Sequence, residues 1–135
     1  MDLLPWYSGL KTGIEAIDKD HKVLVDLLNS LNVAYRESHG RAIFFKSLVA
    51  LKDETSLHFA REEILMQGED YPHLDFHKKQ HSELLDQLNT IISSIEDGSQ
   101  IISMTTMTFL RDWLRYHFQG SDRQFAAFLD NKGLL

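Results

Sequence analysis

Apolar residues recur along the chain at alternating intervals of three and four, the spacing that places side chains on one face of an α-helix. Four stretches show this pattern, and none shows the period-two alternation of a half-buried strand. The expected inward positions are, in chain order, Ile17, His21, Leu24, Leu28, Leu31 and Tyr35; Phe44, Leu48, Leu51, Thr55, His58, Glu62 and Leu65; Leu74, His77, His81, Leu84, Leu88, Ile91 and Ile95; and Ile102, Thr106, Leu110, Trp113 and His117. The pattern therefore predicts four helices.

Residues that start or stop helices separate these stretches. Asp18 is placed to cap the first helix, and Gly40 to end it. Gly68 ends the second helix, and Pro72 sets the backbone of the first turn of the third. Gly120, with the serine after it, should interrupt or kink the last helix. The expected helices cover, approximately, residues 18–40, 41–66, 72–96 and 100–131.

Short connections between these helices make consecutive helices antiparallel. The expected fold is all-α, an up-down-up-down antiparallel four-helix bundle over about 18–131. Residues 1–17, which include Pro5 and Gly13, are too irregular for a helix and should form an N-terminal arm. The 135 residues are enough for one sizeable core, so we expect a single domain over 1–135.

Six titratable side chains occupy inward positions where leucine would be the simple choice. They are His21, His58, Glu62, His77, His81 and His117. Burying a carboxylate without a partner costs several kcal/mol, so something inside the bundle must offset that cost. A single histidine, or a single pair four residues apart, is more often part of a hydrogen-bonded core than a ligand. The combination from four helices favours a metal site, and a buried polar network is the alternative.

Asp122 is a seventh candidate, five residues after His117. In an ideal α-helix five residues rotate by about 500°, which leaves the two side chains about 140° apart. Either an irregular turn at Gly120 brings Asp122 to the same face as His117, or Asp122 caps a short last helix. The spacing by itself leaves both readings open.

Composition limits the chemistry of such a site. The chain has no cysteine, so histidine and carboxylate must hold any metal, which suits iron, manganese or zinc. A net charge of −6 without a block of basic residues argues against a nucleic-acid surface. No apolar run approaches the ~18 residues that span a membrane, and the first residues do not resemble a signal peptide. We expect a soluble, cytoplasmic protein.

With these residues in place, the chain resembles the hemerythrin family, and in its length the single-domain bacterial hemerythrins. The resemblance covers nearly the whole chain and rests on spaced motifs: Ile17-Asp18-Lys19-Asp20-His21, His58-Phe59-Ala60-Arg61-Glu62-Glu63, Tyr71-Pro72, His77-x-x-x-His81 and Trp113-Leu114-x-x-His117-x-x-x-x-Asp122. It implies two non-haem iron ions joined by a bridging oxo or hydroxo group. By this resemblance His77, His81 and His117 bind one iron, His21 and His58 bind the other, and Glu62 and Asp122 bridge them.

The implied ligand set leaves one coordination position open, on the iron with two histidines. The resemblance therefore implies reversible O2 binding, for storage, delivery or sensing, and no enzymatic activity beyond a low level of peroxidase or oxidase turnover. It places Leu114 at the O2 pocket, and Trp113, which shares a helix face with His117, should form a wall of the same site. O2 is the expected partner, with a separate signalling or O2-consuming protein as a further one, and neither nucleic acid nor membrane is expected.

Three alternatives compete with this function: a di-iron enzyme, a regulatory module and a zinc protein. A ferritin-like di-iron oxidase uses Glu-x-x-His pairs, and the chain contains none. Peroxidase or nitric-oxide chemistry at a hemerythrin-like centre stays open, as does a regulatory module that senses iron or O2. Zinc in place of iron is the third alternative, which metal analysis distinguishes.

Overall fold

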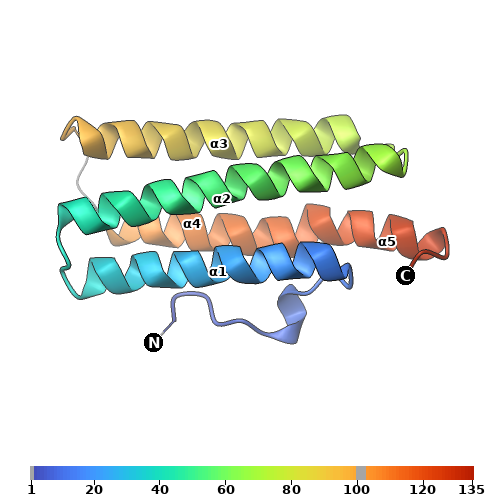
Figure 1. Ribbon diagram of the computed structural model, residues 1–135, viewed down its shortest axis with the longest axis horizontal. Coiled ribbons are helices and arrows are strands. Elements are labelled where there is room, and N and C mark those ends of the chain that lie inside the picture. The colour runs from blue at the N-terminus through green and yellow to red at the C-terminus, as the bar shows by residue number, and fades with distance from the viewer. Residues whose placement is uncertain (1, 100–102) are drawn as a thin grey trace.

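The computed structural model describes residues 2–99 and 103–135. Four long helical segments lie side by side and reverse direction at each connection, which is the expected up-down-up-down four-helix bundle (Figure 1). The segments are α1 (Glu15–Arg36), α2 (Arg41–Gly68), α3 (Leu74–Glu96) and a last one made of three pieces, α4 (Met104–His117), the π-helical turn η2 (Phe118–Asp122) and α5 (Arg123–Asn131). α1 packs on α2 and α4, and α2 packs on α3.

Before the bundle the chain forms an arm that lies along α1 (Figure 1). It contains a short 3-10 turn, η1 (Ser8–Leu10), and is anchored by its buried Leu4 and Leu10. The Asn29 side chain of α1 accepts from the Leu4 backbone N–H at 2.9 Å and donates to the Leu4 carbonyl at 3.0 Å. The arm is therefore fixed to the bundle by both apolar burial and paired hydrogen bonds.

Some helix ends differ from those expected. α1 begins three residues before Asp18, so Asp18 does not cap it. Instead the Asp18 carboxylate accepts from the Thr12 N–H at 2.7 Å and the Gly13 N–H at 3.1 Å, which fastens the end of the arm to the first turns of α1. α3 begins at Leu74, after Pro72 rather than at it. Gln100 and Ile102, where we expected the fourth helix to start, lie outside the described residues.

Two apolar clusters fill the bundle, and a polar layer separates them. The larger includes Leu24 of α1 and Phe59 of α2, and the smaller includes Ile17 of α1 and Met66 of α2. His21 lies between the two clusters along α1, and Glu62 lies between them along α2. Leu65, expected to face inward, is 40% exposed, because the buried stripe of α2 runs through Glu62 and Met66 instead.

No helix in the described part of the chain is both long enough and apolar enough to cross a membrane.

Candidate metal centre

The seven candidate residues come together in the polar layer as two overlapping groups. In each group, every residue offers one ligand atom within 4.8 Å of the others. One group holds five residues and the other four, and both contain Glu62 and Asp122. The five-residue group is Glu62, His77, His81, His117 and Asp122, and the four-residue group is His21, His58, Glu62 and Asp122. All four helical segments of the bundle contribute.

Regular helical spacing accounts for most of this convergence. His58 and Glu62 are four residues apart on α2, and His77 and His81 are four apart on α3, so each pair shares a face. His21 points from α1 toward the same layer and is fully buried. These five side chains are placed by ordinary α-helix geometry.

Asp122 reaches the layer because the backbone between it and His117 is not α-helical. Residues Phe118–Asp122 form a π-helical turn, which is wider than an α-turn and places residues five apart on one face. Asp122 is fully buried, and its side chain makes no cap hydrogen bond to α5. The interpretation of Asp122 as a helix cap is therefore wrong, and the irregular turn expected at Gly120 is present as η2.

Each shared carboxylate directs one oxygen toward each group. Glu62 Oε2 lies 2.7 Å from His58 Nε2, whereas Glu62 Oε1 lies 2.7 Å from His77 Nε2. Asp122 Oδ2 lies 2.9 Å from His21 Nε2, whereas Asp122 Oδ1 lies 2.9 Å from His77 Nε2. Each carboxylate therefore has one oxygen beside the histidines of each group.

The donor set fits metal ions better than it fits an internal hydrogen-bond network. His58 Nε2, Glu62 Oε2, His21 Nε2 and Asp122 Oδ2 are buried and have no hydrogen bond of acceptable geometry, although they lie close together. His81 Nε2 and His117 Nε2 face each other at 3.2 Å. Ligand atoms about 2.1 Å from a common ion and at right angles are about 3 Å apart. Nitrogen- and oxygen-only donor sets of this kind suit iron, manganese or zinc.

The pKa values of these groups are shifted in the directions that favour positive charge in the layer. Burial lowers the pKa of His117, but the charge and hydrogen bonds of Asp122 and Glu62 outweigh it and raise the pKa from 6.5 to about 10. The pKa values of His21 and His77 are raised by the same two carboxylates against the effect of burial. Burial raises the pKa of Asp122, but the neighbouring His117 lowers it to about 2. Either a proton or a metal cation offsets the buried negative charge of Glu62 and Asp122.

Carboxylates outside the layer hold the far nitrogens of two of these histidines. His58 Nδ1 lies 3.0 Å from Asp20 Oδ2, and His81 Nδ1 lies 2.8 Å from Glu63 Oε2. Arg61 in turn binds Asp20 with two hydrogen bonds of 2.9 Å. We did not predict these outer residues from the sequence. Each of these contacts joins two helices, α1 with α2 or α2 with α3, so spacing along one helix did not indicate them.

Aromatic rings cover the faces of three of the imidazoles. The Phe118 ring stacks on His21 at 3.6 Å between centroids, and the Phe59 ring stacks on His81 at 3.7 Å. Trp113 stacks on His117 at 4.6 Å. These contacts fix the ring planes and replace water around the layer.

The two residues expected at a ligand pocket, Leu114 and Trp113, line one small apolar cavity. Its volume is about 10 Å³, and residues of α2 and α3 complete its wall. Neither His39 nor His73 belongs to the two groups. His39 pairs with Glu37 at 2.9 Å on the surface, and His73 is exposed beside Tyr71.

Fold and site together define a four-helix bundle protein with two overlapping, buried groups of histidine and carboxylate side chains. The family described as hemerythrin HHE cation binding domain matches residues 12–129. The chain therefore belongs to the hemerythrin family.

Individual relatives agree with this assignment over most of their length. The chain is 34% identical to the bacteriohemerythrin of Stenotrophomonas maltophilia, over 93% of this chain and 81% of that one. It is 25% identical to the myohemerythrin of Theromyzon tessulatum, over 90% of each chain. A crystal structure of wild-type hemerythrin superposes with a TM-score of 0.86 at 28% identity, covering 93% of this chain and 96% of that one.

Proposed function

We propose that this protein binds O2 reversibly at a pair of non-haem irons, for storage, delivery or sensing of O2. The observation that supports the proposal most strongly is the division of the Glu62 and Asp122 oxygens between two groups of histidines. The proposed iron ligands are His21, His58, Glu62, His77, His81, His117 and Asp122. Membership of the hemerythrin family supports iron as the metal.

In this proposal the chain provides more ligands to one iron than to the other. His77, His81 and His117 would hold one iron, His21 and His58 would hold the other, and the carboxylates of Glu62 and Asp122 would contribute to both. The chain therefore offers one ligand fewer on the side of His58, which leaves room there for a small exogenous ligand. When bound, the iron pair supplies reversible O2 binding with the exchange of two electrons.

The residues around the layer keep it dry. Every proposed ligand is at most 5% exposed, and Phe59 and Phe118 are buried against the imidazole faces. Leu114 and Trp113 line an apolar cavity of about 10 Å³, which is at the lower limit for a single water molecule and has none of the seven proposed ligands in its wall. We propose that O2 passes beside these two side chains, because the lining is apolar apart from Thr55, whose hydroxyl donates to the Leu51 carbonyl.

Binding, rather than turnover, is the proposed activity. Outside the seven ligands, the buried side chains of the described residues with polar atoms include Asn32, Thr55, Thr106 and the hydroxyl of Tyr71. The first three are neither acids nor bases near neutral pH, and burial together with the charge of Asp122 raises the pKa of Tyr71, which keeps its hydroxyl protonated. Consumption or use of the stored O2 is then left to a separate protein.

Optical spectroscopy of the iron-loaded protein tests the proposal. The reduced protein should develop a visible absorption band on exposure to O2 and lose it again when O2 is removed under argon. Zinc-loaded protein is the control and should show no band. An iron-loaded protein that gives no O2-dependent band, or that consumes hydrogen peroxide steadily instead, would overturn the proposal in favour of another function for the centre.

A further inference from the structure

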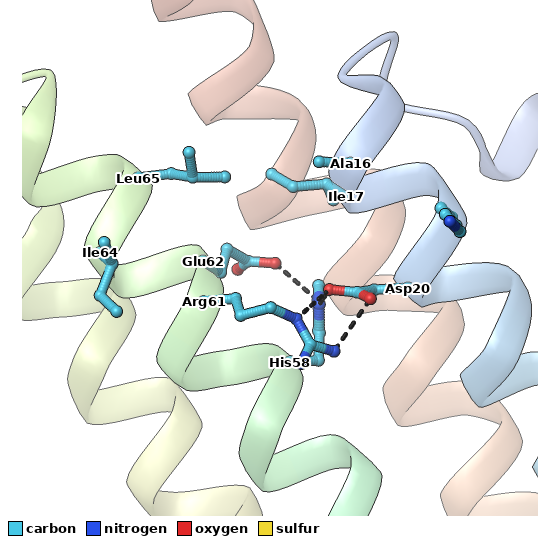
Figure 2. A pocket seen from close by; sticks show the side chains of 9 residues that line it. Ala16, Ile17, Asp20, His58, Arg61, Glu62, Ile64 and Leu65 are labelled. Carbon is cyan, nitrogen blue, oxygen red and sulfur yellow. Dashed lines mark hydrogen bonds and ion pairs between the residues drawn. The ribbon is translucent and has the colours of Figure 1, made fainter.

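A surface pocket between α1 and α2 reaches the outer side of His58. Its volume is about 620 Å³, and its wall includes the buried ligands His58 and Glu62. Figure 2 shows the guanidinium of Arg61 lying beside the Asp20 carboxylate in front of His58. The pocket therefore brings solvent close to a proposed metal ligand, and the Asp20–Arg61 pair lies between the two.

We propose that Asp20 is a positioning residue for His58 and that Arg61 holds Asp20 in place for this role. The inference rests on the proposed function, since it takes His58 to be a metal ligand. It goes beyond that function by assigning the two residues that orient His58. Neither Asp20 nor Arg61 belongs to the two ligand groups.

Hydrogen-bond chemistry fixes what Asp20 does to the ring. An ionised carboxylate only accepts, so the contact of 3.0 Å from Asp20 Oδ2 to His58 Nδ1 requires the hydrogen to be on Nδ1. In the neutral ring the lone pair is then on His58 Nε2, so the 2.7 Å between this atom and Glu62 Oε2 requires a cation or a second proton between them. Metal-binding histidines are commonly oriented by such an outer acceptor. Asp20 therefore selects the tautomer that binds a cation inside the layer.

Arg61 provides the rigidity that Asp20 lacks by itself. The Asp20 side chain is 21% exposed at the edge of the pocket, where water competes for its oxygens. Arg61 donates through Nε to Oδ2 and through Nη2 to Oδ1, a two-point contact that fixes the plane of the carboxylate. The Arg61 side chain is 51% exposed, so the ion pair adds little to folding stability. Its effect should appear in metal binding instead.

The other outer carboxylate is held differently. Glu63 accepts from His81 at 2.8 Å, and the ion pairs of residues 2–99 and 103–135 include no lysine or arginine on Glu63. Its side chain is 26% exposed and lies away from the pocket between α1 and α2. An arginine therefore holds the carboxylate behind His58, the histidine that the pocket reaches.

Metal binding and the tautomer of His58 test the inference in Asp20→Ala and Arg61→Lys. Asp26→Ala is the matched control, because Asp26 also lies on α1 in an ion pair, with Lys22 at 2.6 Å, and contacts no proposed ligand. Cobalt(II) is titrated into the metal-free proteins and followed by its visible absorption. Asp20→Ala should weaken the weaker of two Co²⁺ sites by about 10- to 100-fold, Arg61→Lys by less, and Asp26→Ala should match the wild type.

Nitrogen-15 NMR of the metal-free proteins gives a readout that needs no metal. At a pH at which the His58 ring is neutral, it should carry its hydrogen on Nδ1 in the wild type and in Asp26→Ala, and a mixture of tautomers should appear in Asp20→Ala. Thermal unfolding of the metal-free variants should be equal, which separates positioning from a loss of folding.

The outcomes distinguish this inference from the proposed function. If the wild type binds two Co²⁺ and Asp20→Ala binds both unchanged with the same tautomer, the positioning role is wrong and the metal centre stands. If the wild type binds no metal while the tautomer still depends on Asp20, the proposed function is wrong, and Asp20 orients a histidine that serves another purpose.

Discussion

The two ligand groups differ in how many histidines they hold and in which helices provide them. The five-residue group takes two histidines from α3 and one from α4, and the four-residue group takes His21 from α1 and His58 from α2. Both depend on the same two carboxylates. In the proposed function the two groups have different roles within one layer: the fuller group would hold a cation firmly, and the emptier group would hold one with room for a further ligand.

Their outer surroundings differ in the same sense. His81, in the fuller group, is covered by Phe59 and backed by Glu63. His58, in the emptier group, is backed by Asp20 next to a large surface pocket. The emptier group is therefore the one whose ligands depend more on an added clamp and whose metal should be lost first.

The largest effect is expected from Glu62→Gln, because Glu62 belongs to both groups. An amide cannot present an acceptor oxygen on both sides, so both metal affinities should fall by more than about 100-fold, the upper end of the range for outer partners. Elemental analysis after reconstitution checks this. The control is the neighbouring Glu63→Gln, which should weaken one site by about tenfold. A Glu62→Gln protein that retains two irons would show that the carboxylate is not shared.

The next effect compares one histidine from each group. His58→Ala leaves the emptier group with one histidine, so the protein should retain about one metal ion in place of two. His117→Ala leaves the fuller group with two histidines and should retain both ions at reduced affinity. Competition with a chelator measures the two cases. Equal losses in the two variants would contradict the unequal groups.

Acidity should change both metal affinity and the stability of the metal-free protein. The pKa of His117 is raised from 6.5 to about 10, so its contribution to stability is full below pH 6.5 and is lost as the pH rises through about 10. The pKa of Asp122 is lowered from 3.8 to about 2, so its contribution is full above pH 3.8 and is lost as the pH falls through about 2. Both contributions are full between pH 3.8 and pH 6.5, so the metal-free protein should be most stable in that range.

Metal binding displaces the proton from His117, so Co²⁺ affinity should continue to increase from pH 6.5 toward 10. The increase should be up to about tenfold per pH unit for each proton displaced. Thermal unfolding and Co²⁺ titration across this range provide the check. An affinity that levels off at pH 6.5 would mean that the imidazoles are not held protonated by the shared carboxylates.

A smaller effect is expected from Phe118→Leu. The Phe118 ring stacks on His21 in the emptier group and is fully buried, so its loss should reduce folding stability by roughly 1–3 kcal/mol. It should also speed release of one metal more than the other. Denaturant unfolding and chelator kinetics measure both, with Phe125→Leu as the control for a buried phenylalanine of the other apolar cluster. Identical release kinetics in the two variants would contradict a role for the stacked ring.

Helical periodicity was sufficient to predict the bundle and the candidate residues at regular spacing, such as His58 with Glu62. Both properties depend only on which residues share a helix face. The predicted start of α1 was wrong. An aspartate that could cap a helix can also accept hydrogen bonds from backbone N–H groups that precede the helix, as Asp18 does from Thr12. Local preference alone does not distinguish these two uses.

Asp122 and Asp20 show why the site could be only partly predicted. In a regular α-helix a rotation of about 100° per residue places Asp122 off the face of His117, and the spacing alone did not show that a π-helical turn brings it back. Asp20 meets His58 across two helices, so their contact depends on how α1 is rotated against α2. Spacing along one helix carries no information on that rotation.

The amount of O2 bound per iron tests the central claim most directly, because it depends on both the sharing of ligands and the single open position. Reduced protein containing two irons is titrated with O2 and then flushed with argon, with O2 uptake and release measured by electrode and by absorption. The account predicts one O2 taken up for every two irons and full release under argon. Uptake of one O2 per iron, or irreversible loss of O2, would contradict it.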